Sequence, residues 1–150
     1  MLILTKAAVD DILKCAAQAA TGAVAGPFNG AEIALATAGP APTSEVTLAD
    51  YTECTFAGYV RKPLGTPGAA YDATGREKTV YPSLQWNPTD ATKPETVTFI
   101  LWVSAATGGT LLGVTQLPNP APMANNEDGL VFVPEFGLML TWDYADGTVI

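Results

Sequence analysis

From Phe28 onward, apolar and polar residues alternate in short runs, and each run is followed by glycine, proline or polar turn residues. Alternation with a period of two places the apolar side chains on one face of a β-strand, whereas a helix needs a period of 3.6 residues. The 14 glycines and 12 prolines are scattered between these runs without a repeat. Such punctuation is typical of short strands joined by turns, and it argues against a helical bundle. We therefore expect a mainly β fold.

The strongest predicted strand covers Thr96–Ser104. Its middle, Phe99–Val103, is apolar on both faces, so this strand should run through the centre of the core. Thr107-Gly108-Gly109-Thr110 then predicts a hairpin turn. The other predicted strands are Glu32–Thr37, Tyr51–Val60, Thr79–Trp86, Leu111–Val114, Gly129–Val133 and Phe136–Tyr144. Short strands at this spacing predict an antiparallel β-sandwich or jelly roll.

Details of these runs give finer expectations. In Tyr51–Val60, alternation places Cys54, Phe56 and Val60 on one face. Pro82 marks the Thr79–Trp86 run as an edge strand or a bulged one. The Gly/Pro-rich stretch Pro63–Gly75 and the polar stretch Asn119–Gly129 are expected to be loops.

Residues 5–20 carry the helical signal of the chain. Val9, Ile12, Leu13, Ala16 and Ala20 recur at steps of three and four, Thr5 suits an N-cap, and Gly22 and Gly26-Pro27 end the run. We expect an N-terminal helical arm over residues 1–27 and an antiparallel β domain over residues 28–150. The arm can pack on its own domain or dock on a neighbouring subunit, and the sequence leaves both open.

The charge of the chain limits its partners. Fifteen acidic residues against seven basic ones give a formal net charge of −8, which would repel a phosphate backbone. The longest dense apolar stretch, Phe99–Val103, is far too short to cross a bilayer. The first residues lack the pattern of a signal peptide, so synthesis and folding in the cytoplasm are expected. We expect neither nucleic acid nor membrane as a partner; the acidic surface suits docking on a basic patch of a protein.

The chain contains no histidine, which limits its chemistry. This removes Ser-His-Asp and Cys-His nucleophile systems, histidine-ligated metals and the commonest general base at neutral pH. Cys15 and Cys54 are expected to be buried as small apolar side chains. The acids weighed as a catalytic pair are Glu32, Glu45, Asp50, Glu53, Glu77, Glu127, Asp128, Glu135 and Asp143, and most fall in turns or at strand ends. We therefore predict no catalytic residue and no enzyme.

Two further kinds of site are compatible with the residue types present. Asn125–Gly129 and Asp143–Gly147 are rich in oxygen ligands, but they lack EF-hand spacing and match ordinary turn chemistry better than a calcium site. A platform of aromatic side chains could bind sugar, although core packing suits residues within apolar strands better. The aromatic candidates are Trp86, Trp102, Trp142, Tyr51, Tyr59, Tyr71, Tyr81 and Tyr144. We expect no bound metal and no cofactor.

One segment resembles a known group of proteins. Thr47–Tyr59, TLADYTECTFAGY, is similar to a TLADFTEATFxGY-like segment of small virion structural proteins of tailed phages. A Pro/Thr-rich lead-in at Pro40–Thr43, a P-S-x-x-W strand at Pro82–Trp86 and a strand with a Gly-Gly hairpin at Thr96–Leu112 extend the likeness. It covers roughly residues 40 to 140, and the Thr47–Tyr59 segment is its specific part.

The resemblance implies a structural component of the virion, and it transfers no site residue. From it we expect a capsid decoration (cement) protein that stabilises the head by bridging major capsid subunits, as a homotrimer. Extended Pro-rich segments suit that task because they lie across subunit seams at little ordering cost. The alternatives are a tail, neck or fibre-associated virion protein and a carbohydrate-binding β module.

Overall fold

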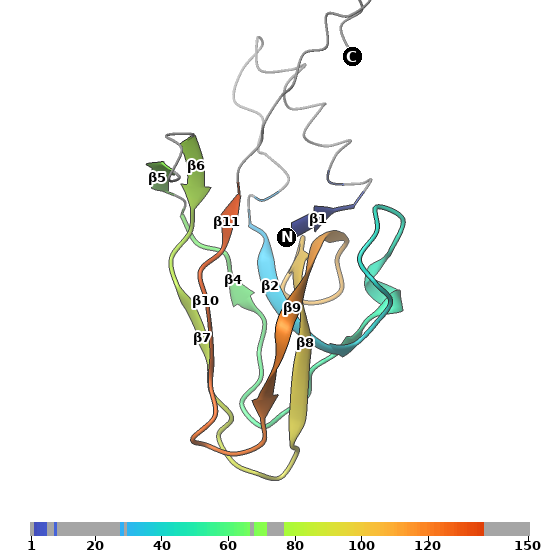
Figure 1. The fold of residues 1–150 in the computed structure, drawn as a ribbon, viewed down its shortest axis with the longest axis vertical. Coiled ribbons are helices and arrows are strands. Elements are labelled where there is room, and N and C mark those ends of the chain that lie inside the picture. The colour runs from blue at the N-terminus through green and yellow to red at the C-terminus, as the bar shows by residue number, and fades with distance from the viewer. Residues whose placement is uncertain are drawn as a thin grey trace, which may run out of the picture.

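The computed structural model of the chain describes residues 2–5, 8, 28, 30–66, 68–71 and 77–136. All strand pairs among these residues are antiparallel. Apart from the isolated helical residue Ala8, helix in this part of the chain is limited to η1, a 3-10 turn at Leu48–Asp50. The expectation of a mainly β fold with antiparallel sheets is therefore confirmed (Figure 1).

A six-stranded sheet forms the centre of the fold, with the order β1-β9-β8-β2-β3 and with β4 also paired to β2. Its strands are β1 (Leu2–Leu4), β2 (Glu32–Ala38), β3 (Thr52–Glu53), β4 (Lys62–Pro63), β8 (Glu95–Val103) and β9 (Leu111–Met123). The predicted central strand is confirmed, since β8 lies between β2 and β9 and is buried on both faces over Phe99–Val103. The predicted hairpin turn is confirmed as well, with Gly108 and Gly109 at positive φ (60° and 85°) between β8 and β9.

The remaining strands form a bent ribbon. β7 (Leu84–Trp86) pairs with β10 (Leu130–Phe132), and β6 (Glu77–Val80) pairs with β11 (Glu135–Phe136) and β5 (Gly68–Tyr71). The β6–β11 pairing continues the β7–β10 pairing, because β6 directly precedes β7 and β11 directly follows β10 along the chain. The two pairings differ in register by one residue, and Tyr81 N–H donates to Pro134 O at 2.9 Å between them. The extra residue lies at Tyr81–Ser83, where Pro82 interrupts the ladder.

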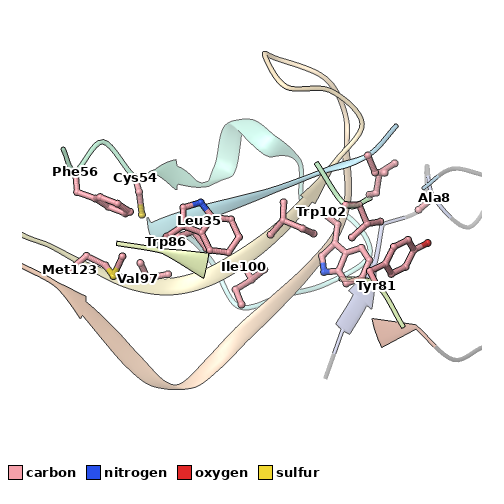
Figure 2. Close-up of a cluster of buried hydrophobic side chains, with 14 residues drawn as sticks. Ala8, Leu35, Cys54, Phe56, Tyr81, Trp86, Val97, Ile100, Trp102 and Met123 are labelled. Carbon is pink, nitrogen blue, oxygen red and sulfur yellow. The ribbon is translucent and has the colours of Figure 1, made fainter. Parts of the chain in front are cut away.

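The main hydrophobic core lies between the ribbon and one face of the large sheet. Ile33, Leu35, Ile100 and Trp102 come from the sheet, and Trp86 comes from the ribbon (Figure 2). Edge-to-face contacts surround the Trp102 ring, with Phe28, Tyr81 and Phe132 at centroid distances of 5.4, 6.3 and 6.4 Å. Each buried side chain of this size contributes roughly 1.5 to 3 kcal/mol by leaving water. A second cluster, including Tyr51, Phe99 and Leu101, covers the opposite face of the sheet.

Several predicted elements are wrong in extent. The Tyr51–Val60 run forms only the two-residue β3, because Gly58 turns the chain at φ +85°, and Val60 is 60% exposed instead of sharing the buried face of Cys54 and Phe56. The Thr79–Trp86 run is split into β6 and β7 at Pro82. The predicted loop Pro63–Gly75 contains β5, and its first residue ends β4.

The predicted loop Asn119–Gly129 is wrong in its first part, since β9 continues to Met123. On β8 the paired residues Phe99 and Val97 are two positions apart, but their partners on β9, Gln116 and Ala121, are separated by the four residues Leu117–Pro120. Pro118 and Pro120 lie in this interruption of the ladder, where a missing N–H is tolerated. Leu117, Ala121 and Met123 belong to the core cluster, so burial of alternate residues keeps the strand on the sheet.

The predicted helix at 5–20 lies almost wholly outside the described residues, and so does Cys15. Thr5 accepts a hydrogen bond from Ala8 N–H at 3.4 Å, the contact that an N-cap makes. The strand expected at Phe136–Tyr144 is described only at its first residue. The helical arm, the division at residue 27 and the sandwich or jelly-roll class stay predictions.

Candidate functional site

The recognisable segment of the sequence, extended to Arg61, is the candidate site, and we call Thr47–Arg61 the signature segment. It begins with a capping box around η1. The Asp50 carboxylate accepts hydrogen bonds from Thr47 N–H at 2.7 Å and from the Thr47 hydroxyl at 2.9 Å. The backbone bond and then the hydroxyl bond lower the pKa of Asp50. This acid therefore starts a turn.

Tyr51 anchors the segment to the sheet. Its ring meets Phe99 edge to face at 5.2 Å, and its hydroxyl donates to Pro40 O at 3.2 Å. The ring lies so close to Gly39 that a Cβ at that position would overlap it. Tyr51 is thus a core residue whose place requires glycine at position 39.

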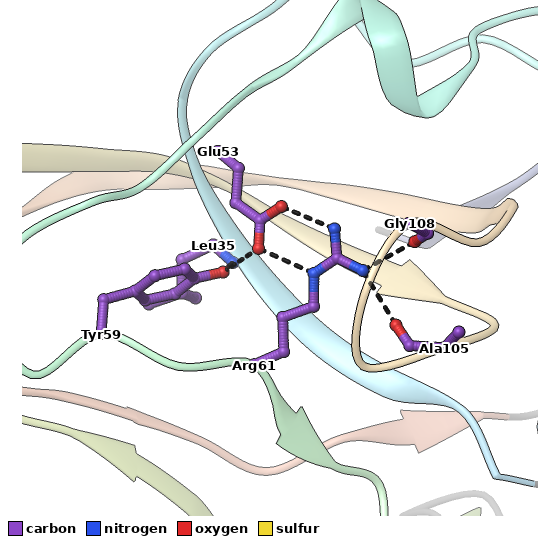
Figure 3. Close-up of polar contacts among 6 residues, drawn as sticks. All are labelled: Leu35, Glu53, Tyr59, Arg61, Ala105 and Gly108. Atoms are coloured by element: carbon purple, nitrogen blue, oxygen red, sulfur yellow. Dashed lines mark hydrogen bonds and ion pairs between the residues drawn. The ribbon is translucent and has the colours of Figure 1, made fainter.

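Arg61 and Glu53 form the centre of a polar network (Figure 3). Arg61 donates to both carboxylate oxygens of Glu53, from Nε at 2.8 Å and from Nη2 at 2.6 Å. Its Nη1 donates to the carbonyls of Ala105 and Gly108 at 2.8 and 2.7 Å. The arginine therefore ties the signature segment to the β8–β9 hairpin through a bidentate ion pair, and its side chain is only 9% exposed.

Tyr59 extends this network to the edge of β2. Its hydroxyl donates to Glu53 Oε1 at 2.6 Å and accepts from Leu35 N–H at 3.1 Å. Cys54 N–H donates to Leu35 O at 2.9 Å, so both backbone groups of Leu35 are satisfied where β2 has no strand partner between β3 and β4. The loop thus substitutes for a neighbouring strand.

The electrostatics of the network are those of a fixed ion pair. Burial alone would raise the pKa of Glu53, but hydrogen bonds from Arg61 and Tyr59 outweigh it and leave this pKa below its ordinary value. Burial and the hydrogen bond to Glu53 raise the pKa of Tyr59. Burial, with Glu95 and Glu53 nearby, raises the pKa of the Cys54 thiol to about 12, so this cysteine is unreactive at neutral pH.

Glu95, at the start of β8, binds the middle of the signature segment through its carboxylate. Its Oε2 accepts from Thr55 N–H at 2.8 Å and from Phe56 N–H at 3.1 Å, and its Oε1 accepts from the Thr55 hydroxyl at 2.8 Å. The charged and hydroxyl groups of Thr47–Arg61 described above are thus used in holding the fold. The segment therefore stabilises the architecture.

The other acids weighed as catalytic occupy different places. Asp128 Oδ2 accepts from the backbone N–H groups of Ala124 and Asn125 at 2.7 and 3.1 Å, the turn chemistry expected of Asn125–Gly129. The Glu45 carboxylate accepts a hydrogen bond from the Ser44 hydroxyl. The side chains of Glu127 and Glu135 are exposed, Glu32 is half-buried in β2, and Glu77 lies in β6. Asp143 and the whole stretch Asp143–Gly147 lie outside the described residues. Among the described residues no group of three or more Cys, Asp or Glu side chains is placed to hold a metal ion.

The aromatic candidates are mostly core residues. Tyr51, Tyr81, Trp86 and Trp102 are all buried, and Tyr59 is half-buried. Trp86 also donates from Nε1 to Val60 O at 2.8 Å, and the Lys62 ammonium lies 5.7 Å from its ring centroid. Tyr71 lies in β5, while Trp142 and Tyr144 are outside the described residues. The expectation of core packing is confirmed for the four buried rings, and Cys54 is confirmed as buried.

Comparison with known proteins identifies the family to which the chain belongs. A family model described as "Podophage GP4 fiber I protein gp80" matches residues 10–135. The chain belongs to this family. No curated protein matches the sequence.

Membership in the gp80 fiber I family confirms the coarse part of the resemblance, since this is a family of phage virion structural proteins. A location in the virion follows from it. The family is one of fibre proteins, so it supports the fibre-associated alternative over capsid decoration. No helix of the described residues is long and apolar enough to cross a bilayer.

The sequence did not point to Arg61 or Glu95 as residues of the site. A signal was available, because Gly58 turns the chain between Glu53 and Arg61 and brings an acid and a base to the same place. The residue spacing does not predict the contacts of the signature segment with Glu95 and with the hairpin carbonyls, because these partners lie about 40 or more residues away along the chain.

Proposed function

We propose that this chain is a fibre-associated structural protein of a podophage virion, acting as a rigid β module and not as an enzyme. The match of the fibre family model over residues 10–135 carries this proposal. Capsid decoration is the weaker alternative, because a decoration protein would be expected to match a head family.

The polar chemistry of the signature segment supports a structural role. Arg61 directs four of its five N–H donors onto Glu53 and two hairpin carbonyls, so most of its hydrogen-bonding capacity is used within the fold. Asp50, Glu95 and Asp128 each accept from backbone N–H groups. A module of a fibre must transmit force without unfolding, and internal bonds of this kind hold loops against the sheet.

The carbohydrate-binding alternative receives less support. It requires at least two of Trp86, Tyr71, Tyr81 and Trp142 to face solvent in one plane. Trp86 is 2% exposed and Tyr81 is 8% exposed, so two of these four rings are used in the core. We therefore propose protein partners within the virion rather than a glycan.

The copy number of the chain per particle tests the proposed location. Symmetry gives a fibre or tail component about six or twelve copies, or a small multiple, whereas a head decoration protein needs hundreds. Quantitative mass spectrometry of purified virions, scaled to the major capsid protein, measures this ratio. A count in the hundreds would overturn the fibre proposal in favour of decoration.

A further inference from the structure

Consecutive strands β9 and β10 each leave an edge without a partner strand among the described residues. The pairing of β9 with β1 stops at Thr115, so the rest of β9 has only β8 beside it. That stretch carries Pro118, Pro120 and Pro122, all exposed. Proline has no N–H to donate, so the open edge of β9 resists the addition of another strand.

β10 lacks this protection. In the described part of the chain it pairs with β7 alone, and neither a proline nor a charge interrupts Leu130–Val133. Val131 is 60% exposed and Val133 is 48% exposed, and Val60 is the other exposed large apolar residue described. An exposed edge of β-branched residues is a ready template for pairing with another chain.

The backbone of Val131 and Val133 is directed toward that open edge. Pro134 O accepts from Tyr81 N–H, so the backbone groups of Pro134 face the β6–β7 side. The N–H and C=O groups of successive residues point to opposite edges of a strand, so those of residues 131 and 133 face away from β7. The N–H that Pro134 lacks is therefore on the β7 side and does not obstruct the open edge.

We propose that β10 pairs antiparallel with β10 of a second copy of this chain, about a twofold axis at Phe132. This register places Val131 of each copy opposite Val133 of the other, on the same exposed face. Each such pair can exchange both of its backbone hydrogen bonds. The two exposed valines are thus complementary to themselves, as a twofold interface requires.

Charge disfavours registers in which the axis lies closer to the N-terminal end of β10. An axis at Val131, or between Val131 and Phe132, would move Glu135 of the second copy toward Glu127 and Asp128, which lie at the turn before β10. Like charges directly opposite each other destabilise a strand pair, and each copy already carries a net charge of −8. An axis at Phe132 sets the uncharged Gly129 opposite that glutamate, and Leu130–Pro134 of the two copies, all uncharged, face each other. The pairing concerns contacts between copies and does not depend on the position of the chain in the virion.

Sedimentation of the purified full chain tests the pairing. We expect a concentration-dependent dimer, and Val131→Lys should raise its dissociation constant by roughly tenfold or more, because two charges then enter the edge. Val60→Lys is the matched control, since Val60 has the same exposed fraction but lies outside β10. A monomeric wild-type chain, a trimer, or an equal effect of the two substitutions would overturn the proposal.

Cysteine pairing tests the register and does not depend on the folding of the lysine variant. Opposite residues of a hydrogen-bonded pair lie about 5.5 Å apart at Cα, within reach of a disulfide. A mixture of Val131→Cys and Val133→Cys chains should therefore cross-link under mild oxidation, while each variant alone and the wild-type chain should not. Equal cross-linking of Val131→Cys with itself, or none in the mixture, would contradict the register.

Discussion

The signature segment and strand β10 use their side chains in opposite ways. In Thr47–Arg61, the Tyr59 hydroxyl contacts the backbone of β2, the Arg61 guanidinium contacts carbonyls of the β8–β9 hairpin, and the Glu53 carboxylate accepts from both side chains. In β10 the alternate residues Leu130 and Phe132 pack on the core, while Val131 and Val133 are exposed. The most recognisable part of the sequence thus holds the fold, and a plain apolar strand offers the surface for assembly. Variants of each region test this division.

The largest effect should come from Arg61→Leu. It leaves Glu53 without its cation and the Ala105 and Gly108 carbonyls without a donor, so we expect a loss of about 3 kcal/mol in the free energy of unfolding. Urea unfolding measures it. Lys62→Met is the control, since this neighbouring cation only approaches the Trp86 ring and should cost about 0.5 kcal/mol. Equal losses for the two variants would contradict a special role of Arg61.

Gly39→Ala should be the next most damaging change. The new methyl group would overlap the Tyr51 ring, and relief of that overlap should cost about 2 kcal/mol. The same substitution in a Tyr51→Leu chain should cost clearly less, because the ring is absent. A double-mutant cycle followed by thermal unfolding gives the coupling between the two sites. Zero coupling would show that Gly39 is not needed for Tyr51.

A smaller effect is expected from the charge on Glu53, and it depends on pH. Its pKa in the folded state lies below the ordinary 4.5, so its ion pair stabilises the protein above that value, and the benefit is lost as the pH falls through the folded pKa. The gap in unfolding free energy between wild type and Glu53→Gln should be full at about pH 7 and narrow toward about pH 3. A gap that is constant over this range would rule out the ionised form as the stabilising one.

The smallest change in stability should follow Val131→Lys, since an exposed side chain away from the core usually shifts the unfolding free energy by less than about 0.5 kcal/mol. Its effect should fall on association alone. Unfolding at a concentration where both chains are monomeric separates the two quantities. A loss of stability comparable to that of Arg61→Leu would remove the distinction between the two regions.

The sequence predicted the elements whose signal is local. The apolar run Phe99–Val103 and the Gly108-Gly109 turn identified the β8–β9 hairpin. A strand buried on both faces requires consecutive apolar residues, and positive φ angles favour glycine, so both features are visible in the local sequence. It failed where pairing is decided at a distance. β4, at Lys62–Pro63, is a strand only because β2 offers it an edge, and alternation overextended β3 through the Gly58 turn.

The candidate site shows the same limit. That Cys54 and Phe56 are buried could be inferred from alternation, but the contacts of Arg61 with Ala105 and Gly108 arise from the packing of a loop on a remote hairpin. The extension of β9 through three prolines was hidden because proline usually marks a loop. Here an open edge and an interrupted ladder accommodate the missing donors.

The position of the chain in the intact virion is the most direct test of the proposed function. Images of particles made with and without the chain can be compared by electron microscopy. We expect the density that disappears to lie at the tail, in the fibres or at their attachment, with the head lattice unchanged. Loss of density spread over the head surface would contradict a fibre protein and restore the decoration hypothesis.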